Sequence, residues 1–203
     1  MKQINNFINE KLIINKNIKV DKYHYHPIDN KELKDLIEKL IKERGNEANL
    51  NDIDTSQITD MSNLFEDSDF NGDISKWDIS NVKDMSGIFL NSDFNGDISE
   101  WDVSNVKNML FMFNSSKFDG DLSKWDVSNV TNMASMFAES KFTGKNGDIS
   151  NWDVSNVEFM SYMFNDSKFS GNISKWNISR DTNIYKMFKG SPLEKNPPKW
   201  YKK

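Results

Sequence analysis

A repeat of about 24 residues dominates the sequence from residue 50 to the C-terminus. All the tryptophans of the chain follow it, with spacings of 24, 24, 27, 24 and 24 residues. Ile53 takes the same place one period before the first of them. Tandem repeats of about 20 to 50 residues form solenoids, in which each unit buries its apolar face only against its neighbours. The tryptophans are Trp77, Trp101, Trp125, Trp152, Trp176 and Trp200.

Each repeat combines a strand-like and a helix-like pattern, as the unit at 98–120 illustrates. Trp101 and Val103 alternate with Asp102, which indicates a short strand with its two apolar residues inward and the aspartate outward. The apolar residues between Val106 and Phe113 then recur at helical spacing. We therefore expect an α/β array of parallel short strands and short helices. It should be curved, because strands stack more closely than helices.

Asparagine recurs at the bend between the two patterns. Asn105 lies where its side-chain amide could satisfy free backbone groups, so a ladder of such amides is expected along the array. An insertion of three residues, Lys145 to Gly147 or a neighbouring triplet, should lie in the turn after Phe142, where a loop lengthens at little cost. The other members of the expected ladder are Asn81, Asn129 and Asn156.

The repeat divides the chain into a lead-in and capping helix at 1–49, a repeat solenoid at 50–190 and a C-terminal cap at 191–203. The capping helix is predicted from Asp29 or Asn30 to about Arg44, since Asp29 and Glu32 have capping-box spacing and Gly45 supplies a stop. Its leucines and isoleucines form one apolar stripe, which suits a cover for the first repeat. A weaker helical pattern occupies residues 7–14.

Charge is distributed unevenly along the chain. Residues 50–170 carry 21 acidic and 8 basic side chains, whereas residues 171–203 carry 2 and 8. An acidic array disfavours nucleic-acid binding along its length, because that binding depends on cationic side chains, and favours a protein partner with a basic surface. The chain has no cysteine and no apolar run of membrane-spanning or secretory length.

The repeat resembles that of BspA-like leucine-rich-repeat surface proteins, which occur in bacteria such as mycoplasmas, fusobacteria and spirochaetes. Its pattern is Trp-Asp-Val-Ser-Asn-Val-x-x-Met-x-x-Met-Phe, followed by Phe-Asn-Gly-Asp-Ile-Ser. The lead-in at 31–41 also resembles the cap that precedes such arrays, so the resemblance runs from about Tyr23 to Trp200. It implies a leucine-rich-repeat-like fold and non-enzymatic protein binding, in some members adhesion to host proteins. The family is often surface-exposed, although this sequence shows neither an export signal nor a lipobox cysteine.

An outward column of aspartates is the first candidate site. Stacked carboxylates repel one another, so a chain that tolerates them could use them to attract a basic partner or cations. The alternative is that each aspartate accepts hydrogen bonds from nearby Ser or backbone N–H groups and serves folding. The expected protein-binding face comprises Asp54, Asp78, Asp102, Asp126 and Asp153 with Lys76, Glu100 and Lys124.

Further candidates have structural alternatives that are as simple. The Trp and Met columns could form an aromatic cage or a promiscuous surface, but their regular recurrence favours a core. His24 and His26 could ligate a metal, although no acidic or cysteine partner lies near them in sequence. An acidic set after the turn glycines could bind calcium or could be ordinary turn chemistry: Asp73, Asp97, Asp121 and Asp148. Three aromatics that break the repeat could form an apolar patch or fill space: Phe111, Phe159 and Tyr162.

Three functions remain open from the sequence. The first is a protein-binding module that uses its acidic strand face. The second is an intracellular or mobile-element-encoded regulator that covers a basic, nucleic-acid-binding surface of its target. The third is a self-associating structural component. No Ser-His-Asp order, Gly-rich phosphate loop or His-Glu-x-x-His motif stands out, so we expect neither enzymatic activity nor a cofactor.

Overall fold

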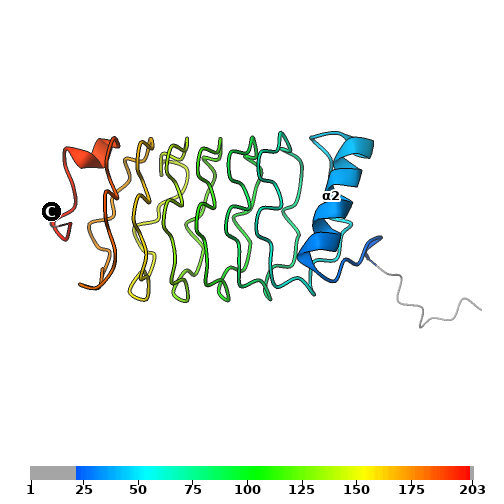
Figure 1. Ribbon diagram of the computed structural model, residues 1–203, viewed down its shortest axis with the longest axis horizontal. Coiled ribbons are helices and arrows are strands. Elements are labelled where there is room, and N and C mark those ends of the chain that lie inside the picture. The colour runs from blue at the N-terminus through cyan, green and yellow to red at the C-terminus, as the bar shows by residue number, and fades with distance from the viewer. Residues whose placement is uncertain (1–21, 202–203) are drawn as a thin grey trace, which may run out of the picture.

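The computed structural model describes residues 22–201. The helical pattern predicted at 7–14 lies outside these residues. Two regular elements occur within them, the helix α2 at Asn30–Arg44 and the short 3-10 helix η1 at Pro192–Glu194. Between the two, the chain winds through a row of similar coils, one for each repeat, which stack along the long axis of the molecule (Figure 1).

Helix α2 covers the end of the row that contains the first repeat (Figure 1). The predicted helix is confirmed, including its N-cap, where the Asp29 carboxylate accepts the Glu32 N–H at 2.8 Å. Gly45 ends the helix with a φ of 89°. Leu33, Ile37 and Leu40 are fully buried, so the predicted apolar stripe faces the array.

Single parallel bridges join each coil to the next. They connect residues 24 positions apart, as in Asp84 with Asn108, except across the insertion, where Asn132 pairs with Phe159, and in the lead-in, where Tyr25 pairs with Ile53. The extra residues are confined to the bend at 144–147. The insertion therefore lies where the sequence predicted it, and pairing resumes in register beyond it.

The predicted strand at Trp101–Val103 has the expected orientation but not the expected pairing. Trp101 and Val103 are buried while Asp102 is exposed. The Trp101 N–H, however, donates to Ile98 of its own coil at 3.2 Å, and the Val103 carbonyl accepts from Val106 at 2.9 Å. These tight turns occupy the groups that a strand would offer to its neighbour, so the bridge lies further along the coil.

The segment predicted as one or two helical turns, Val106–Phe113, instead enters a run of turns that extends to residue 115. Its N–H groups at Met109, Phe111 and Phe113 donate to carbonyls of the next coil at 2.8 to 3.1 Å. Positive φ angles of 57° at Phe111 and 56° at Ser115 make this possible. Because the backbone turns over every four residues, alternate N–H groups point along the stack rather than back into a helix.

Stacked aromatic columns fill the centre of the array. Neighbouring rings such as Phe89 and Phe113 lie 5.5 Å apart and 13° from parallel. Each indole Nε1–H donates to a carbonyl of the preceding coil, as in Trp101 to Ile74 at 3.2 Å. The Trp and Met columns are therefore core, because all their members except the half-buried Trp200 are buried and the indole donors are satisfied. The Trp donors are Trp77, Trp101, Trp125, Trp152, Trp176 and Trp200.

The predicted asparagine ladder is confirmed. The Asn105 side-chain amide donates to the Ser80 carbonyl of the preceding coil at 2.7 Å, and Asn81, Asn129 and Asn156 make the equivalent bond.

No helix among residues 22–201 is both long and apolar enough to cross a bilayer.

Candidate protein-binding face

The aspartate column lies on the surface beside the Trp column. Asp78, Asp102, Asp126 and Asp153 are exposed, and Asp54 is half-buried. Each carboxylate accepts the N–H of the serine two residues later at 3.0 or 3.1 Å through Oδ1. The hydrogen bonding expected of a folding role is therefore present. It uses one oxygen of each carboxylate, so that a row of negative charge still faces solvent.

These hydrogen bonds also lower the pKa of three aspartates of the column. Bonds from the side chain and N–H of Ser128 lower the pKa of Asp126, and the charge of Asp153 acts in the opposite sense. Ser155 lowers the pKa of Asp153 in the same way. For Asp54, burial alone would raise the pKa, but bonds from Ser56 and His26 outweigh it and lower the pKa. Asp54, Asp126 and Asp153 are therefore ionised near neutral pH.

The charged residues predicted to flank the column form a row of their own. Lys76, Glu100 and Lys124 occupy equivalent positions on three successive coils, and all are exposed. Lys124 Nζ and Glu100 Oε1 form an ion pair across the coils. This row thus contributes alternating charge that is partly neutralised, and the aspartate column carries the acidic character of the face.

The second acidic set lies in the turns that precede each tryptophan. Asp97 accepts the Ser99 N–H at 3.0 Å, and Asp148 accepts the Ser150 N–H at 2.8 Å. Asn172 makes the same bond to Ser174 without any charge. Within residues 22–201, no three His, Cys, Asp or Glu side chains group as a metal ion requires. The serine bonds are the turn chemistry that the structural interpretation of the set predicts.

The two histidines have acidic neighbours that lie 28 residues away in sequence. His24 Nδ1 is 3.2 Å from Asp52 Oδ2, and His26 Nδ1 is 3.2 Å from Asp54 Oδ2. Arg44 of α2 also holds Asp52 through both of its terminal nitrogens at 3.0 Å. Sequence reasoning missed these pairs because the lead-in does not follow the 24-residue period. They tie the lead-in to the first repeat.

A family of repeat-containing chains is recognised in this sequence. The family described as "Mycoplasma protein of unknown function, DUF285" matches residues 32–145 and 112–201. The chain belongs to this family. No curated protein and no solved structure matches the chain. The matched residues of this DUF285 chain include α2 from Glu32 onward, every coil and the C-terminal turn.

The aromatics that break the DUF285 repeat do not form one continuous patch. Phe111 and Phe159 are exposed by 40% and 47%, and they lie at different positions of coils that are two repeats apart. Tyr162 instead meets Tyr185 edge to face, with ring centroids 5.5 Å apart. The Lys186 ammonium lies 4.9 Å from the centroid of the Tyr185 ring. An aromatic and cationic cluster thus forms beside the last coil, which the sequence did not predict.

Proposed function

We propose that the array is a leucine-rich-repeat-like solenoid of the BspA type, and that it serves as a non-enzymatic protein-binding module. The stacking of one coil per repeat and the membership of DUF285 support the architecture. The exposed aspartates on successive coils carry the functional proposal. Their partner is a protein with a basic surface.

Recognition works through fixed charge on a stiff frame. Each carboxylate is oriented by the serine N–H that it accepts, so little side-chain entropy is lost when a cation approaches. Lysine and arginine side chains on the partner would meet the second oxygen of the exposed aspartates, whereas that of Asp54 already lies 3.2 Å from His26 Nδ1. Electrostatic complementarity of this kind raises the association rate and selects the partner by charge.

The proposal is tested by removing charge without removing the turn. Asparagine keeps the oxygen that accepts the serine N–H, as Asn172 does with Ser174 at 3.0 Å. The double variant Asp102→Asn and Asp126→Asn should therefore fold normally and lose binding. Its matched control is Asp60→Asn with Asp84→Asn, a change of equal charge at the bridge column, where asparagine occurs in later coils.

The measurement is quantitative capture of crosslinked partners from source cells by the parent chain and both double variants. A basic protein that the parent and the control retain, but that the Asp102 and Asp126 variant loses, supports the aspartate column as the binding face. Equal capture by both variants places binding elsewhere.

A second function uses the same acidic surface, as a regulator that covers the nucleic-acid-binding surface of a target. The excess of carboxylates at 50–170 supports it, because such a surface imitates the charge of a phosphate backbone. Duplex DNA should then displace the captured partner in proportion to its concentration. A partner that stays bound in excess DNA points to the surface-binding function instead.

A further inference from the structure

The last coil presents backbone donors that no carbonyl accepts within residues 22–201. In the coil before it, the Tyr162 N–H donates to the Tyr185 carbonyl at 2.9 Å, as equivalent groups do throughout the array. The corresponding N–H groups of Ile184, Lys186 and Phe188 have no hydrogen-bond partner there. In the array, three donors on alternate residues are met by the alternate carbonyls of the following coil, as Met160, Tyr162 and Phe164 are by Asn183, Tyr185 and Met187.

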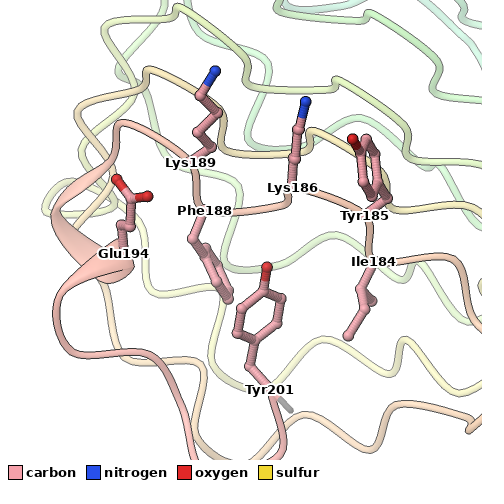
Figure 2. Close-up of a pocket in the computed structure, with 7 residues that line it drawn as sticks. All are labelled: Ile184, Tyr185, Lys186, Phe188, Lys189, Glu194 and Tyr201. Carbon is pink, nitrogen blue, oxygen red and sulfur yellow. The ribbon is translucent and has the colours of Figure 1, made fainter. Parts of the chain in front are cut away.

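A pocket of about 410 Å³ lies over these donors (Figure 2). Ile184, Phe188 and Tyr201 supply its apolar lining. Ile184 is half-buried, whereas Met160, its counterpart one coil earlier, is fully buried. A second pocket, of about 570 Å³, shares Ile184 and is bounded by Trp200. The two pockets provide room for apolar side chains on either side of Ile184.

The charge around these pockets is positive. Lys186 and Lys189 line the first pocket, and Arg180 lines the second. The Glu194 carboxylate, which also lines the first, already accepts the Gly190 N–H at 2.9 Å. The end of the molecule is thus opposite in sign to the aspartate column, and it suits an acidic ligand.

A second copy of the chain fits this edge poorly. Two last coils that meet around a two-fold axis would bring donors against donors. In a head-to-tail contact, the first coil would have to offer its carbonyls to the last coil of another copy. Asn30 Nδ2 already donates to the carbonyls of Asp60 and Ser62 at 3.3 and 3.0 Å. Helix α2 also covers this end of the array (Figure 1).

We infer that the last coil binds an acidic segment of a partner protein, which takes the place of a following coil. The segment's carbonyls accept from Ile184, Lys186 and Phe188, one large apolar side chain enters the pocket against Tyr201, and carboxylates meet the lysines at the rim. This site lies apart from the aspartate column and takes a partner of opposite charge, so either function can fail without the other.

The test uses a synthetic peptide with the sequence of residues 156–167, because the carbonyls of this segment accept from a neighbouring coil in the array. It carries Glu158 and Asp166 and no basic residue. Its control replaces both acidic residues with lysine. We expect the acidic peptide to bind at least about tenfold more tightly than the control. Amide hydrogen exchange should slow at Ile184, Lys186 and Phe188 when it binds.

Two charge reversals of equal size locate the site on the protein. Lys189→Glu should weaken binding by about tenfold, whereas Lys168→Glu, an exposed residue outside both pockets, should leave it unchanged. Absence of binding, equal affinity for both peptides, or exchange rates that do not change at the three amides would each overturn the inference. Self-association of the free chain that Lys189→Glu abolishes would also overturn it, in favour of a second copy.

Discussion

The two ends of the array satisfy their backbone groups differently. At the first coil, Asn30 and Lys34 of α2 donate to carbonyls that would otherwise have no partner. At the last coil, the Glu194 carboxylate accepts the Gly190 N–H, but the donors at Ile184 and Lys186 stay free within the described chain. One end is closed by a helix, and the other is closed only in part.

The difference shows what a cap must supply. Helix α2 buries an apolar stripe and also brings side chains that replace a missing coil. At the other end, Tyr201 meets Phe188 with a centroid distance of 4.8 Å and an angle of 66°, so it covers the aromatic column without continuing its parallel stacking. Covering the apolar columns is therefore enough to end the core. The backbone N–H and C=O groups of a terminal coil need hydrogen-bond partners of their own.

The largest contrast should appear on deletion of apolar contacts. Leu40→Ala empties a fully buried position between α2 and the first repeat and should cost about 2–5 kcal/mol of unfolding free energy. Leu193→Ala in η1 removes a half-buried side chain and should cost less. Chemical denaturation of both variants gives the two values. Equal losses would mean that the two ends are capped equally well.

Amide hydrogen exchange of the unmodified chain should separate the paired and unpaired donors. The Lys186 N–H should exchange about 100-fold faster than the Tyr162 N–H, because only the second is hydrogen-bonded to another coil. Exchange measured residue by residue by NMR spectroscopy tests this. Similar protection of both amides would show that a contact outside the described residues covers the edge.

A smaller effect is expected when the side-chain cap of the first coil is removed. Asn30→Ala leaves the Asp60 and Ser62 carbonyls without this donor and should destabilise the chain by about 1 kcal/mol. Glu194→Ala frees the exposed Gly190 N–H, which water can solvate, so a loss below about 0.5 kcal/mol is expected. If Glu194→Ala proves the more costly, the final turn is the better cap.

The smallest effect should be the acid sensitivity of the first repeat. Hydrogen bonds from Arg44, and to a lesser extent from His24, hold the pKa of Asp52 below its ordinary value despite partial burial. Because the folded-state pKa is the lower one, this stabilisation is present above about pH 4 and is lost as the pH falls through the folded-state pKa. The loss should reach at most about 1 kcal/mol.

Thermal denaturation between pH 7 and pH 3 measures this dependence, with Asp52→Asn as the comparison. The variant should start less stable at pH 7 and lose less on acidification. The last coil carries neutral Asn172 and Asn177 where earlier repeats have aspartate. Amide hydrogen exchange in this coil should therefore respond less to acid than in the first coil. A steeper response there would contradict the assignment.

Most of the repeat could be predicted because each column repeats the same chemistry. The period, the buried Trp and Phe columns, the asparagine ladder, the insertion and α2 all follow from residue types and spacing. The outward position of Asp102 and of the other aspartates in its column could also be predicted from the sequence. Whether they bind a partner is still a prediction, since the same aspartates fold the turns that hold them.

The turns that replace the predicted helical segment could not be inferred from apolar spacing. Positions i, i+3, i+6 and i+7 are equally well met by successive turns with a positive φ every four residues. A signal was present at those positions, because Asn63, Asp67 and Gly87 are residue types that adopt positive φ readily. Phe111 and Tyr162 obscured this signal, since residues with bulky side chains seldom adopt a positive φ.

Helix α2 also favours one order of folding along the array. Each coil bonds mainly to its neighbours, so a coil forms most readily beside one that is already folded. The residues of α2 and the first repeat leave the ribosome before the rest, and domains generally begin to fold from the N-terminal side during synthesis. The helix can thus seed the stack, and every coil in turn becomes a template for the next. The free donors of the last coil are the groups to which a further coil would bond.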